Sequence, residues 1–599
     1  MKNSLRPPLN TEMNAARPGP PAEGVIRHFT RGKEHPRGVV WFGARSFWGH
    51  LRHFIASAIA TESIDSRDWM TPDDPNALVA LITGVLGGKP RATSLIEAIE
   101  RDLYVDFVAD TGDDVAVSRA VARLVFAPYE LPDPDRPGAF LLAPRGEILV
   151  FGGDTAYPVA TAQELSDRVI APWNQVLQAL PDDGRRRVLL GVPGNHDWYD
   201  GLDGFARMFR RRVPGTNARS GGPQISRMMT KHQLEWAREF VRGGRVEKPK
   251  ALVLSGYTTV QNASYFALPL APKMQLLAID RQLTTMDSRQ TGFLRNYYEA
   301  CPDAATLAVL PDPVYAFGDA SKTGTRMVES LHLDFESRET FVLTGDIHHY
   351  ERLERGKLLH VISGGGGAFL HPARIARGGL SPTVVWPGIP QCRKLLLEVP
   401  WKLACGRSGY LPHFGLLLLF ALAYVLNSWL HKYTGLVISA SILTTLFITG
   451  IYSWIGGVAR RPKVLLCSVV AALTTALLPI AGSFLLNRAL ETLGWSTSVV
   501  VVGLTGLALG VFLEAFVFGC YLALLTVLGY ENMQAFTVLD HPGFKQFVRL
   551  RVRADGSGID GWCIGAADPL RDGENPVLVD HFSWRPFREH GAKSARSRE

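Results

Sequence analysis

The sequence predicts a layered α/β domain joined to a block of hydrophobic membrane spans. Three observations support this fold class: β-rich and helical runs alternate between residues 140 and 202, aspartates follow several apolar runs, and residues 411–528 hold long uncharged stretches. At 599 residues the chain is too long for one hydrophobic core, so several structural units are expected.

The N-terminal hundred residues divide into two predicted parts. Residues 1–24 are rich in Pro, Asn, Ala and Gly and lack the apolar run of a signal peptide, which indicates a disordered leader. Residues 25–100 are predicted to form a helical docking region. Within it, residues 41–60 have the pattern of an amphipathic helix with aromatic side chains, which favours a docking or interfacial element over a catalytic one.

A βαβ unit is predicted in the soluble part of the chain. Residues 147–151 and 187–192 have the composition of strands, and residues 163–180 between them have helical periodicity. Further short strands are predicted at residues 105–109, 276–279 and 341–343. Polar residues follow each of these runs.

Aspartates stand directly after four of the predicted strands: Asp110, Asp154, Asp280 and Asp346. In layered α/β folds the carboxyl ends of strands are where functional sites assemble. A single aspartate in a turn is most often structural. Four carboxylates in the same kind of position point together to a metal site.

Two short sequence motifs make this prediction more specific. Gly153-Asp154-Thr155 follows the first strand of the βαβ unit, and Gly194-Asn195-His196-Asp197 follows the second. Here the chain resembles the calcineurin-like metallophosphoesterase superfamily, over roughly residues 103–372. The resemblance implies a metallophosphoesterase-like double β-sandwich flanked by helices, which we assign to residues 101–400, and a site with two divalent metal ions.

The resemblance also implies roles for individual residues. Asp154 matches the aspartate that bridges the two metals, and Asn195 matches the asparagine that binds the second metal. His196 matches the histidine that contacts phosphate and protonates the leaving group. In Gly345-Asp346-Ile347-His348, His348 matches a metal-binding histidine, and Asp110 matches the aspartate of the first motif.

Three histidines of the family pattern are absent. Gly112 and Pro311 stand at two of the positions, with Asp113 and Asp312 beside them as candidate ligands, and Asp346 replaces the third. The ligand set becomes rich in oxygen, which favours Mn²⁺ or Mg²⁺, with Fe and Zn²⁺ as the alternatives.

Three further residues are candidates for the site. Asp197 either orients the imidazole of His196 for catalysis or caps the following helix. His349 and His371 either contact the substrate phosphate or are structural histidines.

Four membrane spans are predicted at residues 411–430, 435–458, 464–486 and 499–528, interrupted by one acid, Glu514. A helix-to-helix hydrogen bond to Thr474 or Thr475 is the favoured role of Glu514. Lysines and arginines are concentrated at residues 393–407 and 460–463, so the positive-inside rule predicts a multi-pass protein with both ends and the catalytic domain in the cytoplasm.

Residues 530–599 are predicted to form a small cytoplasmic β-rich domain with a basic tail, because residues 544–553 and 561–566 read as a hairpin. The six cysteines show no CxxC pair and are predicted to be reduced thiols. The net charge of +8 suits an anionic membrane surface, and no nucleic-acid-binding motif is present, so no nucleic acid partner is expected.

The sequence therefore predicts a membrane-anchored hydrolase that cleaves a phosphomonoester or phosphodiester with metal-activated water. A lipid-linked phosphoester is the leading substrate hypothesis. Two alternatives remain: a catalytically inactive sensor that keeps the fold, and a transporter-like membrane protein with a regulatory hydrolase head.

Overall fold

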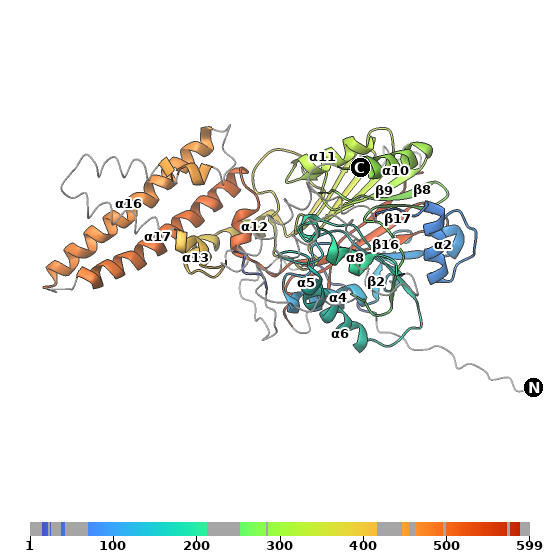
Figure 1. The fold of residues 1–599 in the computed structure, drawn as a ribbon, viewed down its shortest axis with the longest axis horizontal. Helices are drawn as coiled ribbons and strands as arrows, with labels where there is room; N and C mark the ends of the chain where they lie inside the picture. The colour runs from blue at the N-terminus through green and yellow to red at the C-terminus, as the bar shows by residue number, and fades with distance from the viewer. Residues whose placement is uncertain are drawn as a thin grey trace, which may run out of the picture.

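Two seven-stranded sheets form the body of the protein (Figure 1). The computed structural model describes residues 15–21, 24, 38–41, 43, 70–212, 252–282, 286–415, 446–447, 449–453, 462–494, 499–571 and 575–587. The mixed α/β architecture with two large sheets agrees with the predicted fold class.

The first sheet has the strand order β18-β17-β16-β1-β4-β5-β6. Its parallel half carries the predicted βαβ unit, because β1, β4, β5 and β6 run in the same direction. The other three strands are antiparallel. The bounds are β1 (Leu103–Val108), β4 (Ile148–Phe151), β5 (Arg187–Gly191), β6 (Tyr257–Thr259), β16 (Lys545–Val552), β17 (Ile559–Ala566) and β18 (Val577–Trp584).

The second sheet has the order β15-β13-β14-β12-β9-β8-β7. Its central strands β8, β9, β12 and β14 are parallel, and its edges are antiparallel. The bounds are β7 (Phe266–Ala271), β8 (Met274–Ala278), β9 (Ala305–Leu310), β12 (Thr340–Thr344), β13 (Tyr350–Arg355), β14 (Leu358–Ser363) and β15 (Val384–Trp386). Two short hairpins, β2 (Tyr129–Pro132) with β3 (Phe140–Ala143) and β10 (Tyr315–Ala316) with β11 (Asp319–Ala320), lie outside the sheets.

Side chains alternate between two hydrophobic cores, as the period of a strand requires. Phe107 of β1 and Leu343 of β12 belong to one core, which lies between the sheets. Val108 and Val342, one residue away on each strand, belong to the other core, which lies under the helices. The sheets therefore pack face to face and bury their outer faces under helices.

Helices cover these outer faces. In Figure 1, α10 and α11 lie on one side of the sheets, and α4, α5 and α6 lie on the opposite side. The predicted helix at residues 163–180 is present, but a π-helical turn divides it. The bounds are α2 (Pro75–Leu86), α3 (Leu95–Ile99), α4 (Val115–Phe126), α5 (Ala162–Leu165), η1 (Ser166–Ile170), α6 (Ala171–Ala179), α7 (Asn195–Trp198), α8 (Asp203–Phe209), α10 (Ser288–Ala300) and α11 (Lys322–Leu331).

The segment predicted as a separate C-terminal domain is instead part of the first sheet. The predicted hairpin is present as β16 and β17, but β16 pairs along its length with β1. Arg549 of β16 and Asp106 of β1 are both fully buried, and their Nε and Oδ1 atoms are 2.6 Å apart. A separate domain was predicted because the pattern of a strand does not identify its partner in the sheet.

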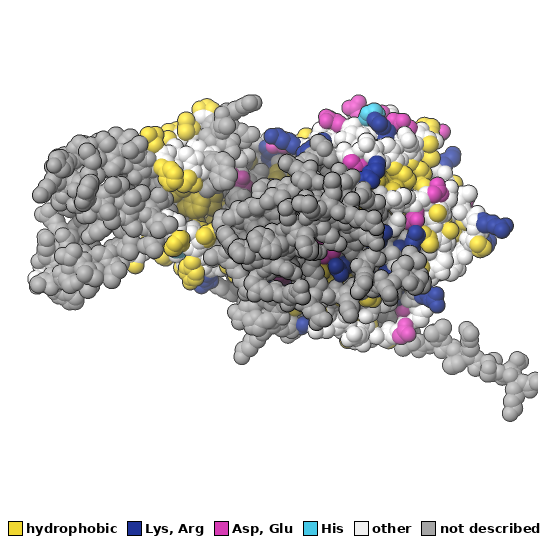
Figure 2. All heavy atoms as spheres, in the orientation of Figure 1, with side chains coloured by type: hydrophobic (Ala, Val, Ile, Leu, Met, Phe, Trp, Pro, Cys, Tyr) yellow, Lys and Arg dark blue, Asp and Glu magenta, His cyan; other side chains and the backbone are white. Residues whose placement is uncertain are grey.

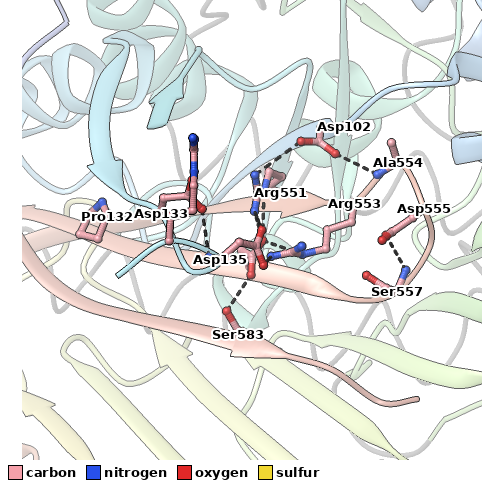
Figure 3. Close-up of polar contacts among 12 residues, drawn as sticks. Asp102, Pro132, Asp133, Asp135, Arg551, Arg553, Ala554, Asp555, Ser557 and Ser583 are labelled. Atoms are coloured by element: carbon pink, nitrogen blue, oxygen red, sulfur yellow. Dashed lines mark hydrogen bonds and ion pairs between the residues drawn. The ribbon is translucent and has the colours of Figure 1, made fainter. Parts of the chain in front are cut away.

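A second group of ion pairs lies where β16 and β17 meet the turn between them. Figure 3 shows Arg551 of β16, and Arg553 directly after this strand, beside Asp102 and Asp135. Asp560 of β17 is fully buried and accepts from both arginines, at 2.6 and 3.0 Å. Both arginines are therefore paired with carboxylates of the body.

The N-terminal segment also differs from its prediction where it is described. Ala16 and Gly19 form bridges to Tyr129 and Val577, so this part of the predicted disordered leader lies along the body. In the predicted docking region, α2 and α3 pack into the core between the sheets. Residues 44–60, most of the predicted amphipathic helix, lie outside the described residues.

Two long helices, α16 (Pro462–Thr492) and α17 (Val499–Leu528), extend away from the sheets side by side (Figure 1). Within the described residues, one helical segment, Val511–Leu528, is long and apolar enough to cross a membrane. Most of the first two predicted spans lies outside the described residues. The predicted block of four spans is therefore reduced to one candidate in the part of the chain that is described.

Three short helices connect this pair to the body: α12 (Ile389–Leu396), α13 (Val399–Ala404) and α18 (Gln534–Leu539). Hydrophobic side chains lie on the surface near these connections (Figure 2), among them Trp401, Leu466 and Val527. Glu514 is buried in α17, and its Oε2 atom has no hydrogen-bond partner among the described residues. Of the two partners expected for it, Thr475 is hydrogen-bonded to Tyr452 and Thr474 donates to the Val470 carbonyl.

Candidate metal centre

The carboxyl ends of β1, β4 and β12 bring Asp110, Asp154 and Asp346 together. All three have left-handed backbone conformations, with φ of 59°, 47° and 67°. Such conformations are uncommon for residues with side chains and are concentrated at functional sites. The Asp346 amide donates to Asp110 Oδ2 over 2.9 Å, which joins the two sheets at this point.

Tyr157 lies at the centre of the first group of predicted ligands. Its hydroxyl oxygen is 3.0 Å from Asp110 Oδ1, 3.4 Å from Asp154 Oδ2 and 3.1 Å from His348 Nε2. The side chain is buried. A hydroxyl has one proton to donate, so it cannot satisfy all three acceptors at once.

The sequence analysis missed Tyr157. The only local signal is an aromatic hydroxyl three residues after Asp154, in Gly153-Asp154-Thr155-Ala156-Tyr157. A tyrosine in that position is more often a core residue.

His348 is oriented as a metal-binding histidine requires. Its Nδ1 atom is 2.7 Å from the carbonyl oxygen of Phe369, which holds the proton on Nδ1 and leaves the Nε2 lone pair facing Tyr157. Burial, together with His371 and Lys545, lowers the pKa of His348 well below its usual value, so the neutral ligand form is favoured.

His371, predicted to bind substrate, lies behind His348. The two rings stack with centroids 3.9 Å apart, and His371 Nδ1 accepts from the His348 amide over 3.1 Å. Burial lowers the pKa of His371 to about 3. His371 therefore supports His348 rather than facing a substrate.

The buried carboxylates destabilise one another's charge. Burial raises the pKa of Asp110 well above its usual value, and Asp154 and Asp346 raise it further. Burial, together with Asp312 and Asp154, also raises the pKa of Asp346 well above its usual value. A cation among these groups would relieve both the repulsion and the desolvation.

The donor set fits a hard metal ion when the phenol is included. No group of three or more His, Cys, Asp or Glu side chains in the described part of the chain is arranged to hold a metal by itself. Asp110, Asp154 and His348 are spaced around Tyr157, so a metal would bind here with the phenol oxygen as fourth donor. Carboxylates and a phenolate are hard oxygen ligands.

The guanidinium of Arg281 lies between two other predicted metal ligands, Asn195 and Asp312. Arg281, which follows β8, has Nη1 3.2 Å from Asn195 Oδ1 and 3.1 Å from Asp312 Oδ2. The side-chain Nδ2 of Asn195 also donates to the Tyr199 hydroxyl over 3.1 Å. The predicted ligands Asn195 and Asp312 are thus close together, around a guanidinium group that the sequence analysis did not identify.

His196 stands beside Tyr157, with ring centroids 4.5 Å apart. Its amide donates to Asp154 Oδ1 over 2.8 Å, and its Nδ1 is 2.6 Å from the carbonyl oxygen of Pro158. The backbone therefore holds the ring through Nδ1.

The Asp197 carboxylate binds backbone amides of two loops. Its Oδ2 accepts from the Gly194 amide over 2.9 Å, and the Thr155 amide donates to the same carboxylate, so it ties the loops after β4 and β5 together. Burial, followed by Asp154, raises the pKa of Asp197 to about 7. Of the two predicted roles, the geometry supports the helix cap.

Three other predicted residues also have structural partners. Asp113 accepts from the amide of Val39 over 2.8 Å instead of joining the ligand group. His349 is fully buried, with Nε2 3.3 Å from Glu351 Oε2. Asp280 accepts from the indole of Trp198 over 2.8 Å.

Glycine is required where the loops approach the carboxylates most closely. A Cβ atom at Gly194 would lie 2.2 Å from Asp154 Oδ1, and one at Gly364 would lie 2.6 Å from Asp110 Oδ2. The backbone of these loops therefore forms the walls of the candidate centre.

The chain has distant structural likenesses to known proteins. No family model and no curated protein sequence matches the chain. Among solved structures it is similar to GAP50, the anchor in the inner membrane complex of Plasmodium, with 10% identity and a TM-score of 0.29 over 48% of this chain and 78% of that one. It is also similar to PhoD, with 10% identity and a TM-score of 0.24 over 45% of this chain and 58% of that one. Likenesses this distant carry no argument about activity.

Proposed function

We propose that this chain is a metal-dependent phosphoester hydrolase anchored in a membrane. The observation that supports the proposal best is the approach of Asp110, Asp154 and His348 to one phenol oxygen, with His196 beside it. Asp110, Asp154, Tyr157 and His348 would hold the metal. Manganese and magnesium remain candidates. The phenol of Tyr157 also favours iron as the bound metal, because tyrosine is a ligand of iron in proteins.

When bound, the metal would supply an acidified water and a positive charge for the phosphoryl oxygens. His196 is the proposed general acid. Because Nδ1 of His196 is bonded to the Pro158 carbonyl, the proton for the leaving alkoxide would come from Nε2. The backbone contact from His196 to Asp154 keeps this acid close to the metal ligands.

Membrane anchoring is the second part of the proposal. It is supported by the apolar segment Val511–Leu528 and by the hydrophobic side chains on the surface around α13 and α16. We propose the multi-pass arrangement of four spans, with the catalytic body and both ends in the cytoplasm. A phosphoester linked to a lipid is the proposed substrate class, because anchoring would hold the site near such substrates.

The test is hydrolysis of bis-(p-nitrophenyl) phosphate and p-nitrophenyl phosphate by detergent-purified protein with Mn²⁺, Mg²⁺, iron, Zn²⁺ or EDTA. We expect turnover that needs metal and falls by about 10²–10⁴-fold in His196→Ala. Asp154→Ala should lose both metal and turnover. His332→Ala, whose side chain is 60% exposed, is the matched control and should keep full activity. Turnover that survives EDTA would contradict the proposal.

A second candidate function is a non-catalytic sensor that keeps the fold. The contact of Tyr157 and Arg281 with the predicted ligands favours it, because these two side chains satisfy part of the site without metal. No turnover with any metal, together with no measurable metal binding, would support the sensor over the hydrolase.

A further inference from the structure

The group of residues around Arg281 does not fit a second metal ion. The resemblance places Asp154 and Asn195 at the second metal, and two histidines of the family pattern are absent, with Pro311 and Asp346 at their positions. The oxygen donors that remain would suit a hard cation, but the guanidinium of Arg281 lies among them. Arg281 approaches two of the side chains that would be needed, Asn195 and Asp312, within 3.2 Å.

We infer that the guanidinium of Arg281 takes the place of the second metal, so that the chain binds one metal ion and contacts the phosphoryl group of its substrate through Arg281. The inference rests on the proposed function for the first metal. It assigns Arg281 as a substrate-binding residue that nothing in the family pattern identifies.

The contacts of Arg281 account for how it is held. Its side chain is 15% exposed, and the Asp312 carboxylate that pairs with it is 6% exposed. Burial lowers the pKa of Arg281, but Asp312, Asp346 and Asp154 together raise it above its usual value. The same carboxylates that would bind a second metal therefore stabilise the guanidinium charge.

Arg281 also has a hydrogen-bond donor that could serve a phosphate oxygen. Its Nε atom and Asp312 Oδ1 are both buried and have no hydrogen-bond partner among the described residues. A guanidinium presents five donors in one plane and suits phosphate oxygens. A phosphoryl group could accept from Arg281 while the Asn195 and Asp312 contacts keep the side chain in position.

Metal stoichiometry tests this inference without relying on activity. The full chain, purified in detergent, is loaded with Mn²⁺ and dialysed, and bound metal is counted per chain. We expect one Mn²⁺ in the wild type, in Arg281→Lys and in the control Arg295→Ala. Arg295 is a partly exposed arginine of α10 whose Nη1 atom is 3.3 Å from His332 Nε2. Arg281→Ala, which opens the space and removes the charge, should accept a second Mn²⁺.

Phosphate binding provides the second measurement. Inorganic phosphate is titrated into the Mn²⁺-loaded protein by calorimetry. Arg281→Gln fills much of the same space without charge, and we expect it to bind phosphate at least about tenfold more weakly than the wild type. Arg295→Ala should bind phosphate as the wild type does, and the unfolding temperature of each variant checks that it is folded.

Two tightly bound Mn²⁺ ions in the wild type would overturn this inference and leave the proposed hydrolase standing. The inference would also be overturned by one ion in both wild type and Arg281→Ala together with unchanged phosphate affinity in Arg281→Gln. No bound metal in any variant would overturn the proposed function, and the inference with it.

Discussion

The hydroxyl of Tyr157 offers the most direct test of the first metal position. Tyr157→Phe keeps the ring, which packs against Trp41 and His196, and removes only the oxygen. With one donor lost, we expect metal affinity to fall by at least about tenfold while the protein stays folded. Metal titration of the purified variant measures this.

Tyr315→Phe is the control for this substitution, because the Tyr315 hydroxyl has a long contact with the exposed side chain of Arg355. It should bind metal as the wild type does. If Tyr157→Phe also kept wild-type metal affinity, Tyr157 would be a packing residue and not a ligand.

Asp280 predicts a pH dependence of stability. The carboxyl is buried and accepts hydrogen bonds from Ser264, Trp198 and the Gln282 amide, yet burial outweighs them and raises its pKa from 3.8 to about 6. A folded-state pKa above the unfolded value stabilises the protein below pH 3.8. That stabilisation is lost as the pH rises through 6.

The expected size of this change is about 2 kcal/mol between pH 4 and pH 7. Asp280→Asn should remove it, so the difference in free energy of unfolding between wild type and variant should vary over this pH range. Measurements in EDTA keep metal binding separate. Asp319→Asn, at a side chain that is 76% exposed, should leave the pH profile unchanged. A constant difference for Asp280→Asn would show that Asp280 is ionised throughout.

Individual residues show how far sequence reasoning reached. Asp110, Asp154 and His348 could be predicted because each follows a strand end within a recognisable motif. Arg281 could not, because it meets Asn195 86 residues away along the chain. The contact of Asp113 with the Val39 amide, 74 residues away along the chain, could not be predicted either.

At the scale of elements, the junction of β1 and β16 depends on one buried ion pair. Arg549 donates to Asp106 from Nε and Nη2, over 2.6 and 3.1 Å, and also to the Val125 carbonyl. Arg549→Ala would leave a buried carboxylate without its partner, so we expect a loss of about 3–5 kcal/mol in the free energy of unfolding. Chemical denaturation in detergent measures the loss.

The control for this prediction is Arg17→Ala, which breaks an ion pair with Glu130 whose side chains are 57% and 42% exposed. Exposed pairs contribute about 0–1 kcal/mol. If the two variants were equally stable, the β1–β16 junction would not depend on the buried pair, and a separate C-terminal unit would regain support.

The strands themselves were predicted well, and their pairing was not. Residues 105–109 and 544–553 both have the apolar pattern of strands, and both form them. Their pairing joins Asp106 to Arg549, 443 residues apart. Periodicity reports which side chains are buried, but it holds no information about which distant strand lies alongside.

For the whole molecule, the remaining question is whether the α16–α17 pair lies in lipid. Leu473 of α16 is 43% exposed, and Leu142 of the β2–β3 hairpin is 62% exposed. An arginine at an exposed position in water changes stability little. An arginine near the middle of a membrane span costs about 2.5–3.5 kcal/mol.

The comparison of Leu473→Arg with Leu142→Arg therefore distinguishes the two environments. We expect Leu473→Arg to reduce the amount of protein that stays in the membrane after alkaline carbonate extraction, and Leu142→Arg to leave it unchanged. If both variants behaved alike and carbonate released the wild type, α16 and α17 would be a soluble pair of helices. The hydrophobic side chains around α13 would then need a protein partner, and the lipid-linked substrate would lose its main support.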